Sequence, residues 1–305
     1  MTLDSGRAEP SHVFVALHLL ACSVTWGSSF LLIKLLGGSL SPVVLASIRA
    51  LGAAAVLMVF VLAMGRSILP QGREWRDWLV LGTVNGWLPN ILVAFALMRM
   101  DSGPSALIQA AGPVLTAILA HFILAGERLT PAKSVGIVIG LMGVGLLIGP
   151  KALAGGGSLL AVLAMLLLTL GYAMGNVYAR TIPQAEPVRL ALGQQTVSAI
   201  VATLIAVMFF GVADFAPALD NALLLVALSV FSTALPIWIF MRLITTAGPT
   251  KAAMTGYLVP TVAVILGIVV LGEPIVPRQI LGGVIVFLGV AIVTGVVRLP
   301  WRRVA

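Results

Sequence analysis

The chain has 305 residues, of which 60% are hydrophobic and only 9% are charged, and its mean hydropathy is +1.13. A soluble globule of this length cannot bury so much apolar surface, so the composition excludes a water-soluble fold and indicates a polytopic membrane protein. The net charge of +8 fits an excess of basic residues in loops on one side of a membrane better than it fits nucleic-acid binding.

Uncharged stretches close to the roughly 20 residues that a spanning helix needs recur along the chain. The first is too long for a typical signal peptide and follows the acidic residues Asp4 and Glu9, so we interpret it as a retained helix. We predict ten spans, at residues 12–36, 42–64, 78–98, 102–126, 132–149, 152–179, 190–213, 221–241, 252–272 and 279–297.

Two stretches of the chain nearly repeat each other: GERLTPAKSVGIVIGLMGVGLLI from Gly126 and GEPIVPRQILGGVIVFLGVAIVT from Gly272. This duplication predicts two fold units, residues 1–150 and 151–305, with five spans each. Because five is an odd number, the second unit enters the membrane in the opposite direction. Inverted repeats of this kind are typical of secondary transporters, which bind substrate near the midplane between the halves.

The basic residues predict the orientation. If the amino terminus is cytoplasmic, most of the 18 Lys and Arg residues fall on the cytoplasmic side, as the positive-inside rule requires. We therefore predict an all-α integral membrane fold of ten helices in the inner (plasma) membrane, with both termini in the cytoplasm.

Prolines occupy matched positions in the two repeats. Pro89 corresponds to Pro236 in spans three and eight, and Pro113 corresponds to Pro260 in spans four and nine. Each removes a helix hydrogen bond and bends the axis, and paired interruptions point to a transport site. We predict that these four prolines shape and gate a cavity among spans three, four, eight and nine, with spans one and six beside it. The alternative is that proline is simply common in membrane helices.

Amide and aromatic side chains cluster near these prolines or share one face of span six. Buried amides in hydrocarbon must either bond neighbouring helices or line a wet cavity. The sequence therefore gives two readings, helix packing or a mainly apolar pocket for a zwitterionic or amphipathic small molecule. The candidate substrate-binding residues are Trp26, Asn85, Asn90, Gln109, Tyr172, Asn176, Trp238 and Tyr257.

Three charged residues are candidates for a role in transport. Arg49 lies inside span two and either meets a substrate carboxylate or reaches the outer surface along its own stem. Glu127 and Glu273 precede helices that open at Pro131 and Pro277, where a carboxylate either stabilises the helix dipole or takes part in gating or proton coupling. No Asp or Glu lies deep inside a predicted span, which argues against antiport through a central carboxylate.

The segment WGSSF from Trp26 with Lys34, the pair Ser41 and Pro42, and the doubled GE blocks resemble the EamA-type branch of the drug/metabolite transporter superfamily. The resemblance covers nearly the whole chain and implies an exporter of amino acids or related metabolites. An efflux carrier for drugs or cationic solutes is the alternative, and a membrane enzyme or structural subunit is a third reading. We find no catalytic, metal-binding or cofactor motif. We expect a small-molecule substrate, lipid as the surroundings, no nucleic acid, and a monomer, with a homodimer as the alternative.

Overall fold

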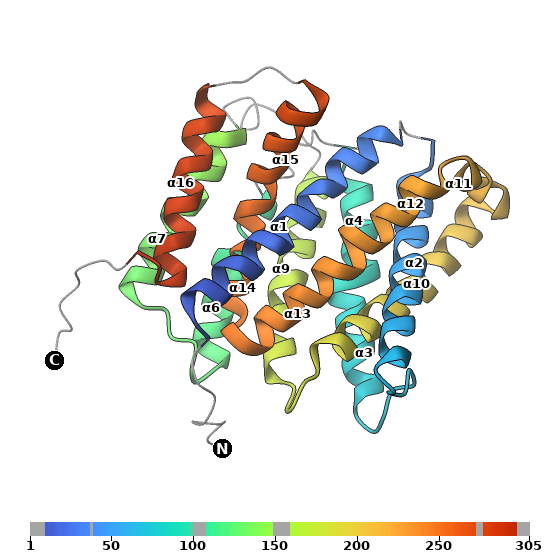
Figure 1. Cartoon of the computed structure of the whole chain (residues 1–305), viewed down its shortest axis with the longest axis horizontal. Helices are drawn as coiled ribbons and strands as arrows, with labels where there is room; N and C mark the ends of the chain where they lie inside the picture. Colours follow the sequence, from blue (N-terminus) through green and yellow to red (C-terminus); the bar gives the residue numbers. More distant parts are fainter. Residues whose placement is uncertain are drawn as a thin grey trace.

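The structure is a computed structural model that describes residues 10–36, 39–97, 99, 108–148, 159–272 and 277–297. Throughout this part of the chain the regular structure is helical (Figure 1). Seven helices are long and apolar enough to cross a membrane, and two further apolar helices, Gly112–Ile123 and Pro131–Leu146, are shorter. The chain is therefore an all-helical, multi-pass membrane protein, whereas the count of ten spans stays a prediction.

The first half contains α1 (His12–Leu35), α2 (Pro42–Ala63), α3 (Glu74–Gly82), the π-helical turn η1 (Thr83–Trp87), α4 (Leu88–Leu97), α6 (Gly112–Ile123) and α7 (Pro131–Ile148). The second half contains α9 (Leu159–Thr181), α10 (Pro187–Phe210), η2 (Val212–Phe215), α11 (Pro217–Asp220), α12 (Ala222–Ser229), the π-helical turn η3 (Val230–Ala234), α13 (Leu235–Ala247), α14 (Pro249–Ala253), α15 (Thr255–Leu271) and α16 (Pro277–Thr294).

Glycine and proline set the helix boundaries, and they move some boundaries away from those expected. Gly211 and Gly248 have φ of +83° and +90°, so they end α10 and α13. The eighth predicted span, 221–241, ends before Arg242, but the helix in the structure continues through Arg242 to Ala247. A single arginine near the membrane surface does not interrupt a helix, because its head group reaches water.

The two halves interlock rather than lying side by side. The most extensive helix contacts pair α7 with α16, α2 with α10, α1 with α15 and α4 with α9, and each pair joins one half to the other (Figure 1). Glycine permits the closest of these contacts, since a Cβ atom at Gly136 would lie 2.8 Å from the carbonyl oxygen of Gly289. Two of these pairs, α7 with α16 and α2 with α10, are equivalent helices of the repeats that meet each other across the molecule.

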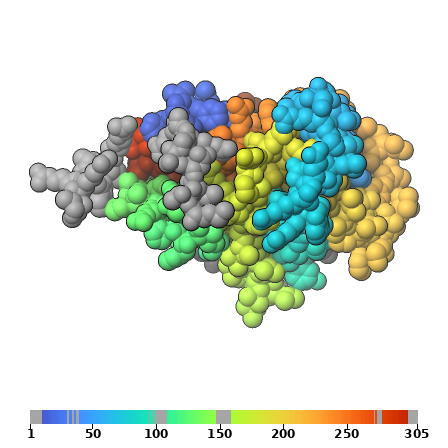
Figure 2. All heavy atoms as spheres, turned by 90° about the horizontal axis from the view of Figure 1, so that it is seen from below, coloured from blue at the N-terminus to red at the C-terminus, as the bar shows by residue number. Residues whose placement is uncertain are grey.

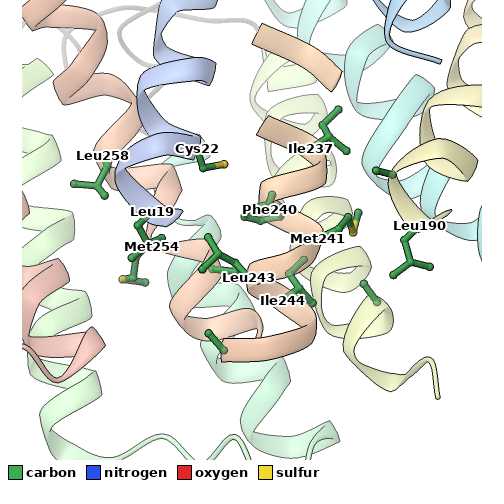
Figure 3. Packing of buried hydrophobic residues seen from close by; sticks show 14 of the residues in the cluster. Leu19, Cys22, Leu190, Ile237, Phe240, Met241, Leu243, Ile244, Met254 and Leu258 are labelled. Carbon is green, nitrogen blue, oxygen red and sulfur yellow. The ribbon is translucent and has the colours of Figure 1, made fainter. Parts of the chain in front are cut away.

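The largest buried cluster extends through the bundle and includes the crossing of α1 and α13. Leu19 and Cys22 from α1 face Phe240 and Leu243 of α13, with Leu258 of α15 beside them (Figure 3). At one end of the bundle the start of α1 meets the end of α16, because the His12 ring Nδ1 lies 2.8 Å from the carbonyl oxygen of Thr294. The first and last described helices therefore begin and end on the same side of the bundle, while its cytoplasmic assignment stays a prediction.

Candidate functional site

Each of the matched prolines Pro89 and Pro236 follows a π-helical turn. The turn η1 precedes Pro89 in span three and η3 precedes Pro236 in span eight, and Gly86 within η1 leaves helical geometry with φ −116° and ψ −107°. Proline cannot donate to the carbonyl four residues earlier, so each interruption frees a carbonyl oxygen in the middle of an apolar bundle. Such an oxygen needs another donor.

A polar side chain from the other half supplies that donor in both cases. The amide Nε2 of Gln194 in α10 donates to the Asn85 carbonyl oxygen at 3.2 Å, and the guanidinium of Arg49 in α2 donates to the Ser232 carbonyl oxygen at 3.4 Å. The helices α2 and α10 are equivalent in the two repeats, as are η1 and η3. The same arrangement, a carbonyl freed by proline and bonded by a side chain of the other half, therefore occurs in both repeats. We call the region between these two prolines the centre of the molecule.

Arg49 lies deep in the protein. Its Nε also donates to Thr233 Oγ1 at 3.3 Å, and it is close enough to the Tyr172 hydroxyl for the two groups to interact electrostatically. Within the described residues no carboxylate pairs with this guanidinium. The side chain keeps part of its surface accessible, so it offers positive charge and spare N–H groups inside the bundle.

An amide cluster lies one helical turn along α9 from Tyr172. Asn176 is 6% exposed, and its Oδ1 accepts a hydrogen bond from Asn85 Nδ2 at 3.4 Å. Residues four apart on a helix lie about 5–6 Å apart on one face. The helix α9 therefore brings Arg49, Tyr172, Asn176 and Asn85 close together, as the helical spacing of span six predicted for its own two members.

The other predicted binding residues lie outside this group. Tyr257 is fully buried, with its ring on Gly140 and its hydroxyl donating to the Ile137 carbonyl oxygen at 3.3 Å, so the structure gives it a packing role. Trp26 packs on Phe240, with ring centroids 5.1 Å apart. Trp238 packs edge to face on Phe60, which is 42% exposed. Asn90 is half-buried, and Gln109 is exposed.

The second pair of prolines is not alike in the two halves. Pro260 lies inside α15, as expected for a kink, but Pro113 lies in the first turn of α6. Proline in a first turn removes no helix hydrogen bond, because the amide there has no helical partner. The chain is helical at 108–109, turns at 110–111 and is helical again from Gly112, so the helical run of span four is interrupted just before Pro113, and the gating role of Pro113 stays a prediction.

Glu127 lies at a contact between the two halves, at the end of the bundle where α1 begins. Its carboxylate pairs with Lys133 at 3.3 Å and lies directly against Gly248, where α13 turns into α14. The helices expected after the two glutamates do begin at Pro131 and Pro277. Glu273 itself lies outside the described residues.

Ion pairs between the halves also close this end. Arg189 of α10 pairs with Glu74 of α3, and Arg66 pairs with Glu186. The Tyr178 hydroxyl donates to Asp77, which is 3% exposed, at 2.5 Å. Figure 2 shows this face, where the α2–α3 segment lies against the α9–α10 segment. In the described residues, cross-half ion pairs occur at this end, so the conformation is closed here.

Gln194 and Ser232 are members of the site that the sequence reasoning missed. Only Ser232 had a signal in the sequence, since it stands four residues before Pro236, as Asn85 stands four before Pro89. The carbonyl that a proline frees can be read from a sequence. The residue that satisfies it cannot, because it comes from another helix.

Comparison with known proteins identifies the family. The model of the EamA-like transporter family matches residues 13–149 and again 159–295. The inner membrane transporter YedA of Escherichia coli K12 is 30% identical over 292 residues, covering 94% of this chain and 92% of that protein. The transporter YyaM of Bacillus subtilis is 27% identical, covering 95% and 96%, and the protein PecM of Dickeya dadantii is 26% identical, covering 88% of each.

A solved structure shares the fold. It superposes with a TM-score of 0.80 at 21% identity, and the match covers 94% of this chain and 98% of the other. Three findings support the same assignment. The family model matches twice, the relatives are similar along nearly the whole chain, and the helices are apolar enough to cross a membrane. The chain therefore belongs to the EamA-like transporter family of the drug/metabolite transporter superfamily and is a multi-pass transporter of the inner membrane.

Proposed function

We propose that the chain exports amino acids or related small metabolites by alternating access between two inverted five-helix halves. The observation that carries the proposal is Arg49, a cation placed beside the proline-interrupted centre and tied to the opposite half through Ser232 and Thr233. A buried guanidinium with spare donors suits a carboxylate. It disfavours the alternative substrate class, drugs and cationic solutes, which it would repel.

The proposed binding group is Arg49, Tyr172, Asn85 and Asn176, and Asn90 and Trp26 stay proposed as further members. A shallow apolar pocket of about 120 Å³ lies next to Pro89 between α4 and α9 and is open to the surface, since Leu167, Leu170 and Met174 in its wall are exposed; the four residues of the binding group do not line it. Few polar groups beside apolar walls suit compounds that share a head group and differ in their side chains. The four matched prolines, Glu127 and Glu273 remain proposed gating elements.

The test is counterflow by the purified protein in liposomes, with the standard amino acids, carboxylate-free amines and a cationic dye as substrates at several pH values. We expect amino acids to move and Arg49→Gln to slow them about tenfold to a hundredfold, since a hydrogen bond to a charged group contributes roughly 1.5–3 kcal/mol. The matched control is Arg99→Gln, because Arg99 is exposed and lies over the Phe95 ring.

The outcomes separate the alternatives. Transport of the dye but of no amino acid would overturn the proposed substrate class in favour of cationic efflux. Wild-type rates in Arg49→Gln would overturn the role of Arg49 while leaving the substrate class intact. A dependence of counterflow on a pH gradient would show proton coupling.

A further inference from the structure

The side chains that satisfy the two freed carbonyls, Arg49 and Gln194, differ in the hydrogen-bonding groups that they have left over. Arg49 has five N–H groups and uses two of them within the described part of the chain, so donors and a positive charge remain. Gln194 donates through its amide Nε2 to the Asn85 carbonyl oxygen. Its Oε1, which can only accept, is not used in this hydrogen bond. One side of the centre thus keeps donors, and the other keeps an acceptor.

The unused acceptors are buried. Gln194 is 5% exposed, and neither its Oε1 nor the Oδ1 of Asn85 has a hydrogen-bond partner among the described residues. An unpaired buried oxygen costs about 1–3 kcal/mol. These two acceptors differ from the other buried unpaired groups in the described residues, such as the Thr196 hydroxyl, because both belong to the residues that meet at the Pro89 interruption, where a donor from outside the chain would find them together.

Both sides of the centre are within reach of one small molecule. The helix α9 carries Tyr172 beside Arg49 and Asn176 bonded to Asn85, and these two residues are one turn apart, roughly 6 Å along the axis. Gln194 joins the Asn85 side of this pair, because its Nε2 donates to the Asn85 carbonyl oxygen at 3.2 Å. This spacing suits the two charged groups of an α-amino acid.

We propose that the substrate is a zwitterion bound in a single orientation, with its carboxylate on Arg49 and its ammonium group on the side-chain oxygens of Gln194 and Asn85. The proposal rests on the proposed function and adds a requirement for a free amino group. A site that held only the carboxylate would accept any small organic anion. Because the two halves are nearly symmetric, the orientation of the bound substrate depends on one difference between them: Arg49 stands on one side and Gln194 on the other.

The test uses derivatives of whichever amino acid shows the fastest counterflow: its N-acetyl form, which lacks the ammonium group, and its amide, which lacks the carboxylate. We expect each to compete at least about tenfold more weakly than the parent, because each loses a charge-assisted hydrogen bond. Competition by the N-acetyl form within about threefold of the parent would overturn the ammonium site and leave the proposed function standing.

A variant ties the effect to Gln194. Gln194→Met keeps the length of the side chain and removes its oxygen, so it should weaken the parent about tenfold and leave the already weak N-acetyl form unchanged. Equal losses for both compounds would overturn the assignment. Thr196→Val is the matched control, since Thr196 lies on the same helix with an unpaired hydroxyl but on another face. Thermal melting in detergent verifies that both variants fold. If no amino acid moves at all, the proposed function fails first and this inference with it.

Discussion

Arg189 joins the two halves through more groups than any single ion pair would provide. It pairs with both carboxylate oxygens of Glu74 and also donates to the carbonyl oxygens of Ser67 and Leu69 in the α2–α3 loop. Its guanidinium lies 5.7 Å from the centre of the Trp78 ring. A planar donor fork is suited to such multiple contacts, and lysine would not replace it.

The pH dependence of this pair has a definite sign. Hydrogen bonding to Arg189 lowers the pKa of Glu74 below its ordinary value of 4.5. The stabilisation is therefore complete above that value and disappears as the pH falls through the lowered pKa. We expect the melting temperature of the wild type in detergent to fall on acidification more steeply than that of Glu74→Gln. Parallel curves for the two proteins would contradict this.

Among single residues, those whose role follows from their own helix were predictable. Tyr172 and Asn176 share a face because of helical spacing, and both join the central group. For Tyr257 the sequence left packing and substrate binding open, because its environment depends on Gly140, a residue of another helix that leaves room for its ring. A sequence without contacts between helices cannot supply that information.

At the scale of the helix, the prolines predicted where spans three and eight are interrupted but not the form of the interruption. Both become π-helical turns whose freed carbonyl is satisfied from the opposite half. Span four is interrupted in another form, by a turn at 110–111 that is followed by α6 with Pro113 in its first turn. Periodicity locates apolar helices well, whereas their exact ends depend on loops and on neighbouring helices.

Replacing a site proline should stiffen its helix. We expect Pro89→Ala to restore a helical hydrogen bond to the Asn85 carbonyl, release Gln194 and slow counterflow about tenfold, with an unchanged or higher melting temperature. Pro187→Ala is the control, because Pro187 stands in the first turn of α10, where no helix hydrogen bond is missing. Equal transport by Pro89→Ala and the wild type would exclude the interruption from the transport cycle.

At the scale of the molecule, the described ends of the chain and the cross-half ion pairs lie at the same end of the bundle. The inverted relation of the repeats stays a prediction from an odd number of spans, whereas the interlocking of the halves could not be predicted from the sequence. Nothing in one repeat alone says that its second helix packs on the second helix of the other.

Labelling with a membrane-impermeant maleimide tests the predicted orientation. Gln71 is exposed in the α2–α3 loop and Asp214 is exposed in the α10–α12 connection, at the opposite end of α10. We expect Gln71→Cys to react only after the cells are opened and Asp214→Cys to react in spheroplasts. The native Cys22 is fully buried and serves as the unlabelled background. The reverse pattern would invert the topology.

The glycine seam between α7 and α16 also bears on the origin of the chain. Gly136 meets the Gly289 carbonyl, and Gly289 in turn lies against Gly140, so the seam is built from corresponding segments of the two repeats. A surface that fits its own copy is what an isologous dimer requires. A five-helix ancestor with this helix would already have carried both faces of the seam. Fusion of two such genes would then have preserved an older pairing of separate subunits, inserted in opposite directions.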